Sequence, residues 1–221
     1  MIRFFQGRDR DQYPREADAM YRLRSRQFHD RLKWNVHVSD GWEIDEFDEM
    51  NPLYLVSIDE TTGAVRGSLR FLPTTGPHMM NGSFGDYFEK PFEMESPLIW
   101  ECSRFSIEPA RHHGRISGSS LRETTFELMH GGCEVAMMAG ISQIVGVFDP
   151  FMLRVYRRTG WGPEIVATSY KTDPGPIHLG IWDVSEANLL SIRERSGISD
   201  TVLETDRLPL TTPRTVSMEV A

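Results

Sequence analysis

Two apolar runs of strand length, at residues 98–107 and 141–148, constrain the fold of this 221-residue chain more than any other feature. The segment between them is long enough for one helix, with Ser119 or Ser120 as its N-cap and an end near Ala139. A helical crossover returns the chain to the same end of a sheet, so we expect the two strands to lie parallel.

The remaining elements surround this pair. They are a helix at residues 15–33, a hairpin of strands at 53–58 and 64–72, a helix at 150–160, a strand at 177–184, and a short helix capped by Ser185. This order predicts an α/β (α+β) fold, a single domain with a mixed central β-sheet flanked by helices. We expect residues 1–200 to form that domain and residues 201–221 to be a loosely held C-terminal tail.

The composition excludes several classes of protein. The formal net charge of −8 argues against general nucleic-acid affinity. Cys102 and Cys133 are the two cysteines, too few for a disulfide framework or a zinc site, and no metal is expected. The first residues carry no apolar stretch of signal-peptide length, and no run approaches a membrane span. We therefore expect a cytoplasmic protein without a membrane span.

Spacing alone leaves the function of the first fifty residues open. Arg24, Phe28 and Trp34 fall at intervals that place helical residues near one face, which by itself favours an amphipathic helix with a solvated basic edge. Asp45 and Asp48 lie in a dense acidic run, which by itself favours a solvated loop. No His or Cys joins this run at ligand spacing, so it does not predict a metal site.

Glu101 occupies an unusual place, within an otherwise apolar strand. A carboxylate there requires a partner, such as Arg104, or a catalytic task. Strict alternation puts Glu101 and Ser103 on one face of the strand and Cys102 and Arg104 on the other. For Glu101 and Arg104 to converge, the strand must carry a bulge or a strong twist.

Several sequence features occur together in a characteristic order. They are the run LRSRQFHDRLKW at residues 23–34, Asp45, Asp48, Arg70, Phe84, and the run WECSRF at residues 100–105. In this order and spacing they resemble the acyl-homoserine-lactone synthases, the LuxI-type enzymes that make quorum-sensing signals. The resemblance covers roughly the first half of the chain and reappears near residues 154–161.

This resemblance implies a fold and a reaction. The fold is similar to that of the GCN5-related N-acetyltransferases, in which the strands at 98–107 and 141–148 splay apart to admit a pantetheine arm. The reaction transfers an acyl group from an acyl carrier protein to the amine of S-adenosylmethionine, closes a lactone and releases methylthioadenosine, without a cofactor. Residues 1–50 would cover the S-adenosylmethionine.

The resemblance also implies roles for individual residues. Glu101 would be the general base, with Asp45, Asp48, Arg70 and Arg104 as a catalytic charge cluster around the substrate. The residues expected to bind S-adenosylmethionine are Arg24, Phe28, Trp34, Phe84 and Phe105. The expected acyl-pocket residues are Met79, Ser103 and Gly146, and the expected carrier-docking residues are Arg111, Arg154, Arg157 and Arg158.

The acyl donor and acyl group are less constrained. Residues 111–115 stand where the acetyltransferases hold a pyrophosphate, but Ile116 replaces a small residue of that loop, which weakens a coenzyme A assignment. Arginines at 154–158 on an acidic chain suit an acidic carrier protein, although such residues also form ordinary solvated helix faces. Gly146 falls where relatives that prefer 3-oxo chains usually carry threonine. It implies a preference for chains without that group, unless it only permits close packing.

Two alternative functions remain open. One is a GCN5-related N-acetyltransferase that uses acyl-coenzyme A, favoured by the fold and disfavoured by the first fifty residues. The other is a non-catalytic regulator that binds an acyl carrier or S-adenosylmethionine. That alternative would require the loss of a key residue, and none of the expected residues is missing.

Overall fold

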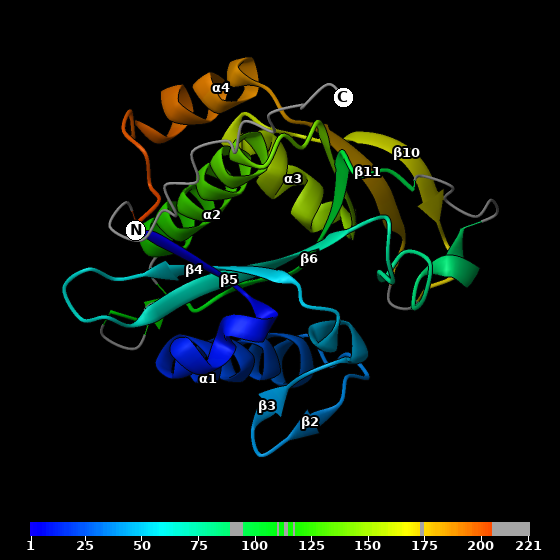
Figure 1. The fold of residues 1–221 in the computed structure, drawn as a ribbon, viewed down its shortest axis with the longest axis horizontal. Helices are drawn as coiled ribbons and strands as arrows, with labels where there is room; N and C mark the ends of the chain where they lie inside the picture. The colour runs from blue at the N-terminus through cyan, green and yellow to red at the C-terminus, as the bar shows by residue number, and fades with distance from the viewer. Residues whose placement is uncertain (89–94, 110, 113–114, 117, 173–174, 205–221) are drawn as a thin grey trace, which may run out of the picture.

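The computed structural model describes residues 1–88, 95–109, 111–112, 115–116, 118–172 and 175–204. Its centre is a seven-stranded sheet in the order β1-β4-β5-β6-β9-β11-β10 (Figure 1). The strands are β1 (Ile2–Gln6), β4 (Leu53–Ile58), β5 (Val65–Pro73), β6 (Ile99–Ile107), β9 (Gln143–Phe148), β11 (Ile177–Asp183) and β10 (Glu164–Ser169). β6 and β9 are parallel and the other neighbours are antiparallel, which confirms the predicted mixed sheet.

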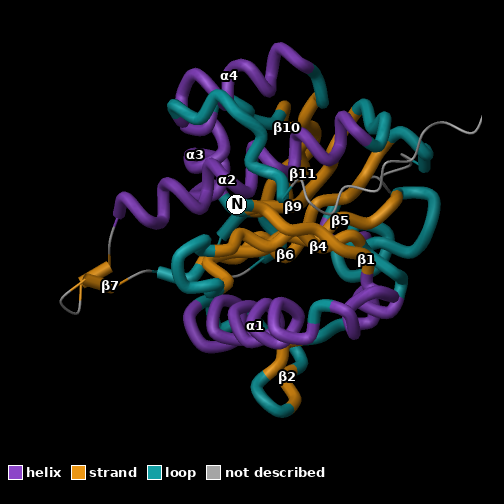
Figure 2. Tube along the Cα trace, turned by 60° about the vertical axis from the view of Figure 1, so that its left-hand side comes forward, coloured by secondary structure: helices purple, strands orange, loops and turns teal. Residues whose placement is uncertain are grey.

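Helices cover both faces of this sheet (Figures 1 and 2). α1 (Pro14–Arg24), continued by the π-helix η2 (Ser25–Arg31), lies on one face, and α2 (Gly118–Met138), α3 (Pro150–Thr159) and α4 (Glu186–Ser196) lie on the other. The shorter elements are β2 (Val38–Ser39), β3 (Trp42–Glu43), β7 (Arg111–His112), β8 (Arg115–Ile116), and the 3₁₀-helices η1 (Gly7–Gln12), η3 (Glu46–Glu49) and η4 (Gly85–Tyr87). Within the described residues, no helix is both long and apolar enough to cross a membrane.

Each face of the sheet has its own core. Leu69 packs with Leu128 and its neighbours on the α2 side. On the α1 side, Met20 packs with Tyr54 and Val56. The alternation of side chains along the strands supplies both cores, because successive residues point to opposite faces. Apolar side chains therefore fill both faces of the sheet where its strands are regular. The sheet is irregular in two places.

The first irregularity is a fork between β6 and β9. Their parallel pairing runs only from Ile99 opposite Gln143 to Glu101 opposite Val145. Beyond that point β6 stays paired with β5 and β9 stays paired with β11 as far as Phe148. The two strands therefore separate just after Glu101, which confirms the splay that the resemblance implied.

The second irregularity is a bulge in β6. Ser68 faces Ser106 and Arg70 faces Ser103, so β6 holds one more residue than β5 across this interval. Arg104 takes up the difference with a left-handed φ of 54°. The expected bulge is confirmed, and it turns Arg104 toward the face that carries Glu101.

Two strands of the seven-stranded sheet escaped the sequence-based prediction, as did the short strands β2, β3, β7 and β8. β1 pairs along the edge of the sheet with β4, and β10 pairs with β11. Both are short, and their apolar residues are too few to form a pattern distinct from that of a loop. The acidic segment after residue 35 is also more ordered than expected, since it holds β2, β3 and η3.

The start of the expected C-terminal tail is anchored rather than loose. Val202 and Leu203 are buried, and Leu203 bridges to Ile2 at the edge of β1. The Thr201 hydroxyl and the Val202 N–H both donate to Glu134 of α2, at 2.9 and 3.2 Å. A loosely held tail therefore does not describe residues 201–204, and residues 205–221 lie outside the described residues.

Candidate active site

A cavity opens beside the fork on the side of η2. Its lining residues come from η2, from β6 beyond the fork, and from the end of β9 and the start of α3. Phe28 and Trp34 stack there with ring centroids 5.1 Å apart, and the guanidinium of Arg104 lies 5.3 Å from the Phe28 centroid. Phe84 and Phe105 add two more aromatic walls. Aromatic faces of this kind attract cations, and a sulfonium is one.

Behind this cavity six charged side chains form a closed ring in which positive and negative groups alternate. In order around the ring they are Arg24, Glu43, Arg104, Asp45, Arg70 and Asp48. Neighbouring nitrogen and oxygen atoms lie 2.5–2.9 Å apart around the whole circuit. Each arginine contacts two carboxylates and each carboxylate contacts two arginines, so the ring is formally neutral.

The charge ring is almost fully removed from water. Arg24 and Arg70 are 1% exposed, and the most exposed member, Asp45, has an 18% exposed side chain. Burial by itself would raise the pKa of Asp48, but the charges of Arg24 and Arg70 outweigh it and hold that pKa well below its usual value. Burial lowers the pKa of Arg104 despite its two acidic partners. Buried charges are tolerated only when paired in this way.

Tyrosines extend the ring into the core beneath α1. The hydroxyl of Tyr54 donates to Asp48 over 2.7 Å, and the Tyr21 and Tyr54 hydroxyls lie 3.1 Å apart. Burial raises the pKa of both phenols, so they stay protonated and can donate. A donor at this position supplies the remaining hydrogen-bonding capacity of a buried carboxylate.

Glu101 stands at the fork, in the wall of the aromatic cavity. Its two oxygens accept hydrogen bonds from the backbone N–H groups of Met79 and Met80, at 3.1 and 2.8 Å. Burial raises the pKa of this carboxyl group, and the two N–H donors offset part of that rise. A carboxylate with a raised pKa at the edge of a cavity is suited to accept a proton near neutral pH.

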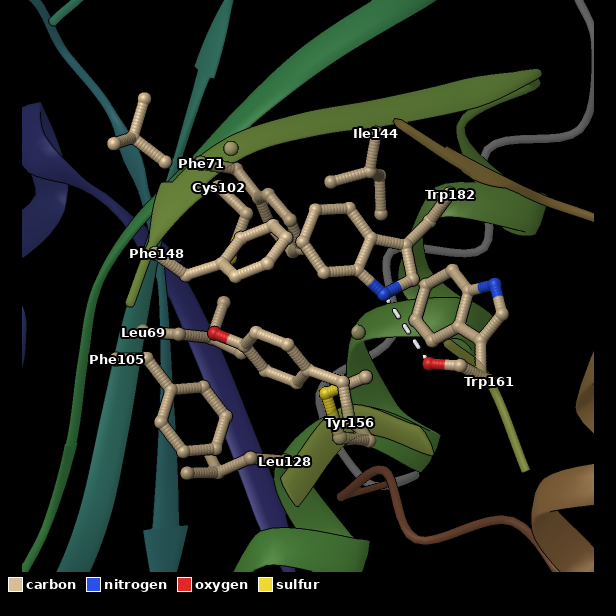
Figure 3. A pocket seen from close by; sticks show the side chains of 14 residues that line it. Leu69, Phe71, Cys102, Phe105, Leu128, Ile144, Phe148, Tyr156, Trp161 and Trp182 are labelled. Carbon is tan, nitrogen blue, oxygen red and sulfur yellow. Dashed lines mark hydrogen bonds between the residues drawn. The ribbon is translucent and has the colours of Figure 1, made fainter. Parts of the chain in front are cut away.

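A second, smaller cavity lies on the other side of the fork, and its lining is almost entirely apolar (Figure 3). Its walls come from the sheet, α2 and α3, and they include Leu69, Phe71, Leu128 and Trp182. The two cavities share the residues Cys102, Phe105, Val147, Phe148 and Tyr156. A polar-aromatic chamber and an apolar chamber therefore meet at the point where β6 and β9 separate.

The structure distributes the expected residues as follows. Phe28, Trp34, Phe84 and Phe105 line the aromatic cavity, and Gly146 lines the apolar one. Met79 and Ser103, expected in the acyl pocket, line the aromatic cavity instead, because they share the face of Glu101. Met79 contacts the Arg70 guanidinium through its sulfur at 3.3 Å, and Ser103 accepts from Arg70 Nε at 3.1 Å.

Arg24, expected to contact S-adenosylmethionine, is instead paired with two carboxylates of the charge ring. Its two Nη atoms each donate to Asp48 at 2.8 Å, and its Nε donates to Glu43 at 2.5 Å. A direct contact with substrate would require these bonds to open. Arg104 is the ring arginine that lines the cavity, since Arg24 and Arg70 lie behind it.

Three of the four expected docking residues lie on the surface. Arg154, Arg157 and Arg158 of α3 are exposed. The backbone of Arg111 belongs to β7, and its side chain lies outside the described part of the structure. Among the described residues there is no group of three or more His, Cys, Asp or Glu side chains that could hold a metal ion.

Three residues of the site were not predicted from the sequence. Glu43 belongs to the charge ring, Tyr54 donates a hydrogen bond to it, and Tyr156 lines both cavities. Glu43 lies in the acidic run two positions before Asp45, where alternation with Trp42 and Ile44 was the available signal. Tyr54 looked like an ordinary strand residue, and no periodicity separates a phenol that donates to a carboxylate from one that fills a core.

The charge ring should be energetically coupled. Replacing Arg70 with Gln leaves Asp45 and Asp48 short of positive charge in a buried site, so Arg70→Gln should lower the free energy of unfolding by about 3–5 kcal/mol. Combining it with Asp48→Asn should cost at least about 1 kcal/mol less than the sum of the two single changes. Urea unfolding of the four proteins measures this cycle.

The exposed pair of Arg22 with Asp18, at 2.9 Å, provides the matched control. Arg22→Gln removes the same charge from a surface pair and should cost less than about 1 kcal/mol. Additive costs in the Arg70 cycle would contradict the coupling.

Comparison with known proteins places this arrangement in a family. A sequence model of the autoinducer synthases matches residues 6–192. An acyl-homoserine-lactone synthase of Rhizobium etli is 43% identical over 180 residues, which cover 81% of this chain and 82% of the relative. A solved structure of a CoA-dependent acyl-homoserine lactone synthase, BjaI, with SAM and isopentyl-CoA, has a TM-score of 0.76 at 23% identity, covering 92% of each chain.

A more distant structure supports the fold alone. A putative N-acetyltransferase from Lactobacillus plantarum is 14% identical with a TM-score of 0.51, covering 83% of this chain and 99% of that chain. The predicted similarity to the N-acetyltransferase fold is confirmed. The family match, the identity to a curated relative and the fold agree: the chain belongs to the autoinducer synthase family and is, like the relatives that it matches, an acyltransferase of the acyl-homoserine-lactone synthase class.

Proposed function

We propose that this enzyme acylates the amine of S-adenosylmethionine from the thioester of an acyl carrier protein and then closes the lactone, releasing methylthioadenosine. The observation that carries the proposal is the position of Glu101 at the fork, in the wall of an aromatic cavity suited to a sulfonium. The next residue, Cys102, lines both this cavity and the apolar cavity, which is suited to an acyl chain. Neither step requires a metal or a redox cofactor.

In the first step Glu101 acts as the general base. The α-amino group of S-adenosylmethionine is protonated in neutral water and must lose a proton before it attacks. Glu101 takes that proton, directly or through one water molecule. The nitrogen then bonds to the thioester carbon and the C–S bond breaks with its electron pair on the carrier's sulfur. The second proton that the nitrogen loses on becoming an amide goes to this thiolate, which leaves as a thiol.

In the second step the charge ring and the aromatic walls hold the substrate folded. The methionyl carboxylate attacks the carbon bonded to the sulfonium, that C–S bond breaks, and its electron pair neutralises the sulfur of methylthioadenosine. A neutral leaving group makes this step easy once the chain is bent, so positioning is the main task of the protein. Arg104, which lines the cavity, is suited to orient the carboxylate.

The carrier protein as donor is supported by the surface of α3. Arg154, Arg157 and Arg158 are exposed on the helix that begins at the end of β9, beside the fork. An acidic carrier would be attracted to them even though the whole enzyme is acidic. The BjaI structure is described as CoA-dependent, so coenzyme A is the competing donor.

One assay separates these functions. The purified protein is mixed with S-adenosylmethionine and one acyl chain supplied either on carrier protein or on coenzyme A, and lactone and methylthioadenosine are quantified. A higher kcat/KM with carrier protein, falling with added salt, supports the proposal. A preference for coenzyme A contradicts the donor, whereas an acylated amine without methylthioadenosine indicates an N-acyltransferase, and no product indicates a regulator.

Glu101→Gln should lower kcat by about 10²–10⁴-fold, because it removes the base while keeping the volume of the side chain. The amide places an NH₂ group against one of the two backbone donors of Met79 and Met80, so the melting temperature should fall as well. In the wild type, kcat/KM should rise with pH as Glu101 loses its proton, at a pH above the usual range for glutamate because burial raises its pKa.

Glu134→Gln is the matched control. Glu134 lies on α2 and, like Glu101, its carboxylate accepts a hydrogen bond from a backbone N–H, that of Val202. The substitution should lower stability without lowering turnover. Near-normal turnover of Glu101→Gln at neutral pH would contradict the assignment of the base.

Trp34→Ala should weaken S-adenosylmethionine binding more than it weakens the fold. Trp34 is 43% exposed and stacks on Phe28 at the mouth of the cavity, so its loss removes an aromatic wall but little buried area. Calorimetric titration with S-adenosylmethionine and thermal melting measure the two effects. Tyr170→Ala, at an 81% exposed tyrosine, is the control and should change neither. A collapse in melting temperature with unchanged affinity would make Trp34 a core residue.

Gly146→Thr should raise the turnover of 3-oxo chains relative to unsubstituted chains by roughly fivefold, the value of one net hydrogen bond. The structure makes this position tight: a Cβ at Gly146 would lie 3.0 Å from the carbonyl oxygen of Cys102 and 3.5 Å from the Trp182 ring. Gly146→Ala therefore serves as the control for crowding alone. A wild-type product profile dominated by 3-oxo lactones would overturn the predicted preference for chains without that group.

A further inference from the structure

Tyr156 stands in the wall shared by the two cavities. It comes from α3, and its ring is held by near-perpendicular contacts with three other aromatic rings. The ring centroids of Phe105, Phe148 and Trp182 lie 6.0, 5.5 and 5.1 Å from it, at interplanar angles of 89°, 86° and 88°. Three such contacts fix the ring, so the position of its hydroxyl group is fixed as well.

That hydroxyl points into the apolar cavity, toward the side where Leu69, Cys102 and Phe148 lie (Figure 3). Tyr156 is 8% exposed, and among the described residues its hydroxyl group has no hydrogen-bond partner. Trp161 and Trp182, which line the same cavity, donate through their ring N–H groups to the carbonyl oxygens of Asp183 and Trp161. Of the three tyrosine and tryptophan side chains that line the apolar cavity, Tyr156 is therefore the one whose polar hydrogen has no acceptor among the described residues.

The Tyr156 hydroxyl is not among the fully buried side-chain atoms without a partner, so water in the cavity can reach it. Removing that water without replacing its hydrogen bond is costly. An acyl chain of methylene groups would displace that water and leave the phenol unsatisfied. A chain with an oxygen at the right carbon would restore the bond. Burial raises the pKa of Tyr156, so the group remains a donor throughout the neutral range.

The location of the hydroxyl limits which carbon can carry that oxygen. Cys102, on the side of the chamber that the hydroxyl faces, directly follows Glu101, where the thioester would react. The partner oxygen must then sit within the first few carbons of the chain. Carbon 3 is the position at which two-carbon elongation of thioesters leaves an oxygen, first as a ketone and, after reduction, as a hydroxyl.

We propose that the Tyr156 hydroxyl selects acyl donors that carry a hydroxyl group at carbon 3. A chain hydroxyl can both accept from the phenol and donate to it, whereas a ketone can only accept. Gly146, on the opposite strand of the fork, adds no donor of its own for a ketone. This inference rests on the proposed function, because it assigns the apolar cavity to the acyl chain.

The test compares Tyr156→Phe with the wild type on three donors of one chain length: unsubstituted, 3-oxo and 3-hydroxy, all on the carrier that supports turnover. The variant should lower kcat/KM for the 3-hydroxy chain by about five- to tenfold and raise it for the unsubstituted chain, because the unsatisfied hydroxyl is gone. Tyr170→Phe, which removes the same atom at an exposed site, should change neither value.

Three results would overturn the proposal. Equal losses for all three chains would mean that the hydroxyl acts on the thioester that they share. A larger loss for the 3-oxo chain than for the 3-hydroxy chain would reverse the assignment, and unchanged values for every chain would mean that the phenol meets no substrate oxygen.

A binding measurement separates this proposal from the proposed function. The 3-hydroxyacyl homoserine lactone should raise the wild-type melting temperature more than the unsubstituted lactone does, and Tyr156→Phe should abolish that difference. Absence of lactone synthesis from every donor would reject the proposed function, while the melting comparison would still decide the role of Tyr156. Equal shifts in the wild type would reject the inference by itself.

Discussion

The closed ring of alternating charges behind the aromatic cavity is the interaction on which the rest of the site depends. Its six members come from α1, from the segment of β3 and η3, from β5 and from the bulge of β6, so four separate parts of the chain meet in it. A buried charge without a partner is strongly destabilising, and the ring therefore forms as a unit or not at all. Because Arg104 reaches the ring only with a left-handed backbone, the ring also requires the bulge that brings this arginine to the face of Glu101.

The fork follows from the same geometry. The bulge of β6 lies just beyond Glu101, the last residue that pairs with β9, so the strand pairs with β9 before the irregularity and departs from it afterwards. A sheet that closed over this interval would bury Glu101 in the core without access to a substrate. By separating after Glu101, the strands leave one carboxylate at the junction of two chambers of opposite polarity. The chemistry of acylation needs such a junction, since a charged amine and an apolar thioester must meet there.

The pattern of apolar and polar residues within single segments was enough to predict the main helices and strands of the mixed sheet. The bulge of β6 was predicted from the conflict between strict alternation and a convergence of Glu101 with Arg104. The bulge is present, but Glu101 accepts from the backbone of Met79 and Met80, and Arg104 pairs with Glu43 and Asp45. The sequence did not predict Glu43, because its partners Arg24 and Arg104 are far away in the chain and only the fold brings them together. Tyr54 was missed because the sequence does not separate a tyrosine that donates to a carboxylate from one that fills a core. β1 and β10 were missed for a related reason: short edge strands are stabilised by their neighbours more than by their own residues. Met79 and Ser103 line the aromatic cavity and not the apolar one, and hydrophobicity and position do not reveal which of two adjoining cavities a side chain faces.

The two chambers also divide the energetic tasks of the reaction. In the aromatic chamber, paired charges and ring faces are fixed before the substrate arrives, so little reorganisation is needed when the chain folds back for lactone closure. In the apolar chamber, specificity comes from shape and from the few polar groups present, because burial of methylene groups alone discriminates weakly between similar chains. Phe148 and Tyr156 belong to both walls, so a change in either chamber is transmitted through residues that the other chamber also uses. In the proposed function, selection of the acyl group and positioning of the amine therefore depend on two cavities that share five lining residues.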